Sequence, residues 1–371
     1  MNRRCTILAV SMLSITGSAS AADLPAKASP AVAVDTPFFK LIDDRITVSW
    51  MPAGTDPGNY SIRPDGSING KTAKQVYSFT HFDIWAYGTN FFNISLLKSD
   101  HNDPANPCTN AGVIFNPTNG TTTSAACEGA SEIFGQIRST FGWNEIFNTK
   151  AFAIDPLRNI SFAVGLDANT VNNRLAPAKR DVVAGLQFQF ALPYKGFFNV
   201  SPLMYWDFAN HNGFAQCGSG FSGPVPGVNC LIDGHRSYNP TWAIETNYYM
   251  DLGFLPESMQ FFSISGRAAW YGPKGTESNP LPYNPLPVAA PANLNTTVEF
   301  NAEPIRLTFD ASKAAWGPKY SHFVDMWVAY RYWQNKFGLD HEKSRLCNVS
   351  PGVSNNTCTE STIYSGITMK F

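Results

Sequence analysis

The stretch STIYSGITMKF, residues 361–371, closes the chain on an alternating pattern. Its odd positions from Ile363 to Phe371 are mainly apolar, and its even positions from Tyr364 to Lys370 are small or polar. Successive residues of a strand point to opposite faces, so this stretch predicts a strand with one apolar and one polar face. An edge strand of a soluble β-sandwich would alternate in the same way, and the rest of the chain has to decide between a sandwich and a membrane barrel.

Twelve segments carry strand patterns of this kind, and no long segment shows a clear helical period. The expected strands are residues 43–51, 75–87, 90–99, 131–142, 159–168, 182–192, 197–209, 240–251, 259–271, 296–310, 322–337 and 361–371.

The connections between these segments alternate in length. The short turns include YGTN (87–90), LPYKG (192–196) and GFLPES (253–258), and the long connections are 100–130, 210–239, 272–295 and 338–360. Short turns at one end and long loops at the other are typical of bacterial outer-membrane barrels. The sequence therefore predicts an all-β fold: a transmembrane antiparallel up-and-down β-barrel of about 12 strands, with short periplasmic turns and long extracellular loops.

The first 21 residues have the pattern of a secretory signal peptide. Arg3 and Arg4 precede an apolar run from residue 7 to about residue 15, and residues 19–21 form a small-x-small cleavage site. The run is shorter than the roughly 20 residues that a spanning helix needs, although a retained anchor is the alternative. We expect a signal peptide at 1–21, a flexible Ala/Pro-rich periplasmic leader at 22–40 and the barrel at 41–371.

Removal of the signal peptide takes Cys5 away and leaves six of the seven cysteines. An even number of cysteines in an exported protein indicates disulfides. The six form close neighbours within loops rich in Gly, Asn, Ser and Thr, which predicts three local disulfides: Cys108–Cys127, Cys217–Cys230 and Cys347–Cys358. Metal binding is the competing interpretation, but these pairs lack close zinc-ligand spacing with histidines nearby.

The composition excludes several classes of protein. Only 15% of the residues are charged and the formal net charge is −1, so no basic stripe indicates a nucleic-acid polymer as partner. No stretch after the signal has 18 consecutive apolar residues, which argues against spanning helices. The expected partners are outer-membrane lipid, lipopolysaccharide and small polar solutes, and the barrel is expected to be a monomer.

Polar and apolar residues occupy opposite faces of several expected strands. In AGLQFQF (184–190), Gln187 and Gln189 oppose leucine and phenylalanine, and in EIFGQIR (132–138) the charged residues oppose two isoleucines. Pro304 interrupts the alternation in EFNAEPIRLTF (299–309). Because a proline in a strand removes a ladder donor, we expect a bulge there.

The same parity yields a set of inward residues that would line a pore or contact a solute. They are His81, Asp83, Trp85, Glu132, Arg138, Asp207, Tyr205, Glu245, Arg267, Glu299, Glu303, Asp325, Trp327, Arg331 and Trp333, with Asp167 as a further acid. Acids outnumber arginines in this set, so the pore is expected to favour cations and neutral polar solutes over anions. The alternative for each charge is a salt-bridged plug with a structural role.

Aromatic residues share the inward parity at seven positions: Tyr77, Phe79, Trp85, Tyr87, Tyr205, Trp327 and Trp333. In a water-filled interior such rings could stack against a nucleobase or another planar solute. Near strand ends the same rings could instead belong to an interfacial girdle.

Three segments carry a resemblance to a known family: FTHFDIWAYGTNFFNISLLKSD (79–100), EIFGQIRSTFGWNEIFN (132–148) and WVAYRYWQNKFG (327–338). Their aromatic-rich strands resemble those of the Tsx-like nucleoside-specific channel-forming outer-membrane proteins. The resemblance is one of pattern over most of the mature chain, and it implies a twelve-stranded monomeric barrel with a narrow passage. The cysteine-bearing loops and the leader depart from the family, and no nucleoside-contacting residue carries over.

These observations predict an outer-membrane channel for passive diffusion of small polar solutes, with nucleosides as one candidate. The alternative is a closed structural or surface-interaction barrel without transport. An enzyme is not expected, because the chain has no G-x-S-x-G, HExxH or phosphate-loop motif, and no residues indicate a cofactor. An outer-membrane phospholipase would need a serine and a histidine together near the lipid side, whereas His81 is expected to face inward.

Overall fold

The computed structural model describes residues 37–62, 65–100, 103–104, 113–116, 121–124, 129–172, 178–208, 238–276, 294–295, 297–344, 347–350 and 352–371. Residues 38–371 belong to one compact unit. The expected signal peptide and the leader up to residue 36 lie outside the described residues. Among the residues that the structure describes, no helix has the length and apolar character needed to cross a membrane.

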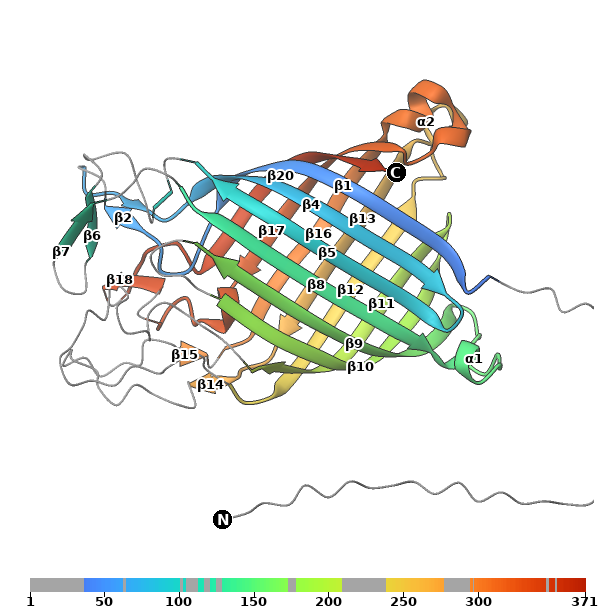
Figure 1. Ribbon diagram of the computed structural model, residues 1–371, viewed down its shortest axis with the longest axis horizontal. Helices are drawn as coiled ribbons and strands as arrows, with labels where there is room; N and C mark the ends of the chain where they lie inside the picture. The colour runs from blue at the N-terminus through green and yellow to red at the C-terminus, as the bar shows by residue number, and fades with distance from the viewer. Residues whose placement is uncertain are drawn as a thin grey trace, which may run out of the picture. The chain divides into compact units, whose positions relative to one another are not determined.

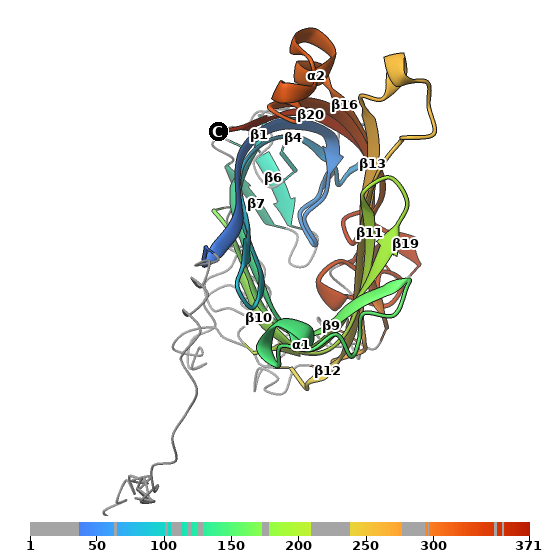
Figure 2. The same cartoon turned by 90° about the vertical axis from the view of Figure 1, so that its right-hand side faces the viewer.

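Twelve antiparallel strands close into a barrel, which Figures 1 and 2 show from two directions. They are β1 (Phe39–Gly54), β4 (Thr72–Trp85), β5 (Gly88–Ser99), β8 (Ser131–Gly142), β9 (Leu157–Val171), β10 (Ala178–Leu192), β11 (Gly196–Asp207), β12 (Thr241–Asp251), β13 (Phe262–Tyr271), β16 (Glu299–Asp310), β17 (Val324–Gln334) and β20 (Thr359–Lys370). Each pairs with its neighbours in this order, and β20 closes the ring on β1. All twelve expected strands are therefore confirmed.

The connections fall at two ends of the barrel, and Figure 1 shows α1 and α2 together at one of them. We call this the short-turn end; it carries α1 (Trp143–Ile146), η1 (Glu257–Met259), α2 (Ala311–Trp316) and η2 (Pro318–Tyr320). The opposite, long-loop end carries η3 (Lys336–Gly338) and the two-stranded ribbons β2–β3 (Ser61–Ile62, Ile68–Asn69), β6–β7 (Val113–Asn116, Thr121–Ser124), β14–β15 (Gly275–Thr276, Leu294–Asn295) and β18–β19 (Asn348–Ser350, Val353–Ser354).

The bulge expected at Pro304 is present in β16. The register with β13 shifts between Ser265 and Arg267, and the register with β17 shifts between Ala302 and Ile305. An extra residue at this point reverses the parity of the strand. Arg306 therefore lies on the same inner face as Glu303 although the two are three positions apart.

The closing strand β20 has the faces that its sequence predicts. Phe371 exposes 68% of its surface on the outside, and its ring centroid lies 6.3 Å from that of Phe79 on β4. The backbone N–H of Phe371 donates to the carbonyl oxygen of Asp44 at 3.1 Å, so the last residue is fixed to β1. Tyr364 and Thr368 on the other face are buried in the interior.

Candidate functional site

The interior of the barrel is the candidate functional site, and side-chain exposure distinguishes its inner wall from the outer wall. On β17, Met326 and Val328 expose 48% and 43% of their surface, whereas Asp325, Trp327 and Ala329 expose 3%, 7% and 3%. A membrane barrel turns its apolar face outward to lipid and its polar face inward. The odd positions of β17 therefore form the inner wall.

Residues that pair across neighbouring strands point to the same face of the sheet. The pairing register therefore identifies the inner face of the other strands from that of β17. It places most of the sequence-predicted site residues on the inner face: Glu132, Arg138, Asp167, Tyr205, Asp207, Glu245, Arg267, Glu299, Glu303, Asp325, Trp327, Arg331 and Trp333.

The expected inward residues of β4 lie on the outer face, which corrects the sequence-based assignment. β4 pairs Phe79 with Ile46 and Tyr77 with Val48, and both aliphatic side chains belong to the exposed outer wall. The same parity directs three further residues outward: His81, Asp83 and Trp85. Both faces of β4 carry aromatic rings, so its alternation alone could not identify the inner side; Tyr87 lies in the following turn.

His81 is held in a polar patch on the outer wall, near the short-turn end. Its Nδ1 atom lies 2.7 Å from the carboxylate of Asp44, and its Nε2 atom lies 3.1 Å from that of Asp83. The side-chain amide of Asn90 donates to Asp83 at 3.0 Å. In the described part of the chain no serine hydroxyl bonds to His81, so the pair that a lipid-side hydrolase would need is not formed there.

Water-accessible polar residues line the middle of the inner wall. Arg267 on β13 and Asn247 on β12 are paired neighbours, and both side chains are exposed although they face inward. The amide of Asn199 on β11 donates to Asn247 at 2.8 Å. Arg267 makes no ion pair within the described residues. At this level the barrel interior has room for solvent and presents an exposed positive charge, whose cross-strand neighbour is Glu303.

Toward the long-loop end, Arg138 bridges the interior from β8 to β12. Its guanidinium donates to Asp167 on the adjacent β9 at 2.7 and 2.9 Å, and to Glu245 on β12 at 3.0 and 2.7 Å. β9, β10 and β11 separate the two ends of this bridge in the ring. Tyr271 on β13 adds a hydrogen bond to Glu245 at 3.1 Å. Two-pronged ion pairs of this kind fix geometry, so the bridge narrows the interior.

A second cluster joins β16, β17 and β20. Arg306 donates to Glu303 at 2.7 Å, and the hydroxyl of Tyr364 bonds to the same carboxylate. The guanidinium carbon of Arg306 lies 4.0 Å from the centroid of the Trp327 ring, whose Nε1–H donates to Thr368 at 3.0 Å. The face of Trp327 is therefore already covered by a cation.

At the long-loop end, buried lysines connect strands to loop residues. Lys74 on β4 contacts Asp56 at 2.9 Å and Glu132 at 3.0 Å. Lys336 in η3 contacts Glu360 on β20 at 3.0 Å. Neither lysine was expected in the interior. Lys74 lies just outside the expected strand 75–87, and Lys336 lies in the expected strand 322–337 at an even position, whereas the inward positions of that strand are odd. β17 ends at Gln334, so this parity does not extend to Lys336.

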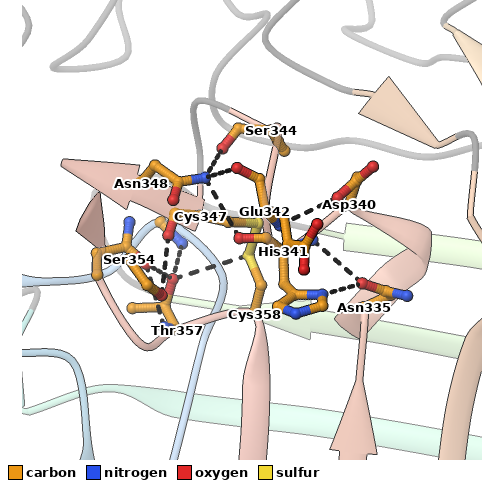
Figure 3. Close-up of a disulfide and its surroundings, with 12 residues drawn as sticks. Asn335, Asp340, His341, Glu342, Ser344, Cys347, Asn348, Ser354, Thr357 and Cys358 are labelled. Carbon is orange, nitrogen blue, oxygen red and sulfur yellow. Dashed lines mark hydrogen bonds between the residues drawn. A yellow bond between two sulfur atoms is a disulfide. The ribbon is translucent and has the colours of Figure 1, made fainter. Parts of the chain in front are cut away.

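The expected disulfide Cys347–Cys358 is confirmed, with its Cα atoms 5.4 Å apart. Figure 3 shows the bond within the loop that follows β17, where the amide of Asn348 donates to surrounding backbone carbonyls. Both cysteines are buried. The other two expected pairs, Cys108–Cys127 and Cys217–Cys230, lie outside the described residues.

The disulfide-bonded loop packs against the segment between β1 and β4. The N–H of Gly58 donates to the hydroxyl of Thr357 at 2.9 Å, and the N–H of Thr55 donates to Glu360 at 2.9 Å. A Cβ atom on Gly70 would lie 2.2 Å from the carbonyl oxygen of Asn355, so only glycine permits this approach. These two loops together cover part of the long-loop end.

A cluster of lysine, carboxylate and tyrosine residues fills the interior beside these loops. Lys179 on β10 lies 3.2 Å from Asp181, and Lys274 lies 2.5 Å from Asp207. Tyr205 on β11 is only 1% exposed and packs between them. Lys179 and Asp181 precede the expected strand 182–192 and were therefore not among the expected inward residues. Extending the alternation of that strand by three residues toward the N-terminus places both on the inner face.

A cavity of about 230 Å³ lies at the short-turn end, lined in part by Tyr249, Asp251, Lys313 and His322. Asp310, His322 and Asp325 are the set of described residues there that could hold a metal ion. Asp310, however, already accepts hydrogen bonds from its neighbours, including the N–H groups of Lys313 and His322 at 2.8 Å each.

His322 is a hydrogen-bonded link at this end. Its Nδ1 atom lies 3.0 Å from Asp325, and its Nε2 atom lies 3.2 Å from the hydroxyl of Tyr249. The hydrogen bond to Asp325 raises the pKa of His322. The imidazole of His322 thereby links the turn before β17 to β12.

Comparison with known proteins gives no family for this chain. No family model and no curated protein matches it. Among solved structures, an outer membrane channel from Pseudomonas putida F1 aligns with a TM-score of 0.38 at 10% identity, over 93% of this chain and 100% of that one. OccK11 of Pseudomonas aeruginosa gives 0.31 at 7% identity, over 89% and 95%. OpdK of Pseudomonas aeruginosa, in a structure with vanillate, gives 0.32 at 8% identity, over 89% and 98%.

The sequence identities and TM-scores are too low to infer any property of this chain from these proteins. The resemblance to the Tsx-like family stays a prediction.

Proposed function

We propose that this chain is an outer-membrane channel for passive diffusion of small polar solutes. The support comes from its two faces: an apolar outer wall suited to lipid and a polar inner wall suited to water. Outer-membrane lipid and lipopolysaccharide are the proposed surroundings, and one barrel is the proposed functional unit.

The observation that carries the proposal is the exposed pair Arg267 and Asn247 at the middle of the inner wall. A barrel that only has to be stable would bury its inner charges in ion pairs, as Arg138 does. An arginine that is exposed and makes no salt bridge among the described residues instead suits a wall that meets water and passing solute.

The class of solute depends on which side chains of the inner wall are free to contact it. Most inner acids have partners within the wall, which weakens the expected preference for cations at the middle of the barrel. The face of Trp327 is covered by Arg306, and that of Trp333 lies 4.6 Å from the ammonium of Lys336. A nucleoside would have to displace these cations in order to stack, so we propose polar solutes in general and treat nucleosides as one class to be tested.

Liposome swelling with purified, refolded protein tests the proposal. The solutes are a nucleoside, a neutral sugar of similar size and an anionic nucleotide, and protein-free liposomes are the control. Uptake of the sugar supports a general channel, and faster uptake of the nucleoside supports the narrower class. No swelling with any solute, from liposomes shown to contain folded protein, would contradict transport.

One observation favours the closed-barrel alternative. Arg138 bridges the interior to Glu245, and Phe337 approaches Lys179 on the opposite wall at 5.9 Å. If these groups never separate, the barrel is a structural or surface-recognition protein, and the swelling assay would show no uptake.

A further inference from the structure

The ammonium group of Lys179 is surrounded by aromatic rings. It lies 5.3 Å from the ring centroid of Tyr205, 5.7 Å from that of Tyr271 and 5.9 Å from that of Phe337. Tyr205 and Tyr271 come from β11 and β13, which only β12 separates in the ring, and Phe337 comes from η3. A cation is attracted by ring faces within about 6 Å, so three faces make a cage for an ammonium group. We call Lys179, these three aromatic residues and the carboxylates around them the ammonium cage.

The carboxylates of the cage outnumber its ammonium groups. Asp181, Asp207 and Glu299 interact with Lys179, and Lys274 is the second cation. Three acids share two lysines, and all three acids are at most 2% exposed. Oδ1 of Asp181 and Oε2 of Glu299 have no hydrogen-bond partner among the described residues. Buried carboxylate oxygens without donors attract a further cation.

The cage lies between the middle of the barrel and the long-loop end. Tyr271 links it to Glu245 and thereby to the Arg138 bridge, and Arg267 and Asn247 follow on the side of the short turns. A solute that crosses the barrel has to pass this level. The cage is therefore in the position of a selectivity site for the proposed channel.

We propose that the ammonium cage recognises solutes that carry an ammonium group, and that Lys179 is the resident occupant that such a solute displaces. This inference rests on the proposed channel function. The rings and the carboxylates supply the two interactions that an alkylammonium ion requires, and the flexible stem of a lysine allows its head group to leave without a backbone change. A neutral solute of equal size gains neither interaction.

The test removes the ammonium group of Lys179 by substitution and then adds a small ammonium compound that can take its place. Lys179→Ala deletes three methylene groups and the ammonium, and the matching probe is n-propylammonium. Calorimetric titration of the refolded variant should show binding about tenfold tighter than to the wild type, in which Lys179 competes. 1-Propanol, a neutral probe of similar size, should not bind.

Lys319→Ala is the matched control variant. Lys319 lies 5.8 Å from the ring of Tyr320 at the short-turn end and has no carboxylate partner within salt-bridge distance among the described residues. Its removal should leave n-propylammonium binding at the wild-type level. Equal binding by the two variants, or binding of 1-propanol as tight as that of n-propylammonium, would overturn the proposal.

A second variant covers the case in which Lys179→Ala does not fold. Lys179→Met keeps the stem and removes the charge, and its probe is methylammonium, which should bind more tightly than to the wild type. Binding is measured without transport, so the two proposals fail separately. Swelling without ammonium binding would contradict the ammonium cage and support the channel. Binding without swelling would support the cage and contradict the channel.

Discussion

Replacing Arg138 tests whether the bridge across the interior holds the barrel together. Its side chain is 17% exposed and satisfies two carboxylates, Asp167 at 14% and Glu245 at 21% exposure. Arg138→Met leaves both acids in the interior without a cation. Removing one partner of a buried ion pair costs about 3–5 kcal/mol, so we expect a loss in that range in the free energy of unfolding.

Glu245→Gln gives the second arm of a double-mutant cycle. It keeps the size of the side chain and leaves Arg138 paired with Asp167, so the expected cost is about 1–2 kcal/mol. In the double variant the glutamine removes one of the two stranded charges that Arg138→Met creates. The losses of the two single variants in the free energy of unfolding should therefore sum to more than the loss of the double variant. The difference, which is the coupling energy, should be about 2 kcal/mol.

The assay is equilibrium unfolding in urea, with the barrel in phospholipid vesicles and tryptophan fluorescence as the signal. Arg180→Met is the control, because Arg180 is an exposed arginine on the outer face of β10; its cost should stay within about 0.5 kcal/mol. If the effects of Arg138→Met and Glu245→Gln add within about 0.5 kcal/mol, the two side chains do not interact and the bridge is refuted.

Three further predictions address the loop, the faces and the short-turn end. Replacing Cys347 and Cys358 by serine opens a loop with a sequence separation of 11, and should lower the free energy of unfolding by roughly 3 kcal/mol; an unchanged urea midpoint would show that the loop needs no clamp. Val48→Arg should cost about 2–4 kcal/mol because the position lies on the apolar outer wall that the proposed channel turns to lipid, while Asn247→Glu, opposite Arg267 on the inner wall, should cost little; equal costs would reverse the face assignment. The raised pKa of His322 means that its stabilising contribution is complete below its ordinary value of 6.5 and is lost as the pH rises through the raised value. His322→Gln should therefore remove this decline from a pH series of unfolding free energies, and an identical decline in the variant would exclude His322 as its source.

The fold could be predicted from the sequence because barrel strands alternate apolar and polar residues with a period of two, and because their connections alternate between short and long. In β20 and β17 one face is apolar and the other polar, so parity alone gives the inner wall. The bulge was also readable, since Pro304 cannot donate to the ladder and the charged residues on either side of it change parity.

The site was only partly predictable, because the missing information is in pairing and in loops. In β4 both faces carry rings, and only the pairing of Phe79 with Ile46 reveals that His81 and Asp83 face outward. Lys179 lies before the expected start of its strand. Phe337 is the last residue of the expected strand 322–337 but lies in η3, and nothing in the sequence shows that it lies beside Lys179 of β10.

The measurement that tests the channel most directly is ion current through single barrels in planar bilayers, with a salt gradient across the membrane. An open channel should give discrete current steps. Arg267→Gln should shift the reversal potential toward greater cation preference, because the substitution removes an exposed positive charge from the wall. No current at any voltage from barrels known to be inserted would contradict the proposed channel function. Steps with a reversal potential that Arg267→Gln leaves unchanged would show that ions do not pass the middle of the inner wall.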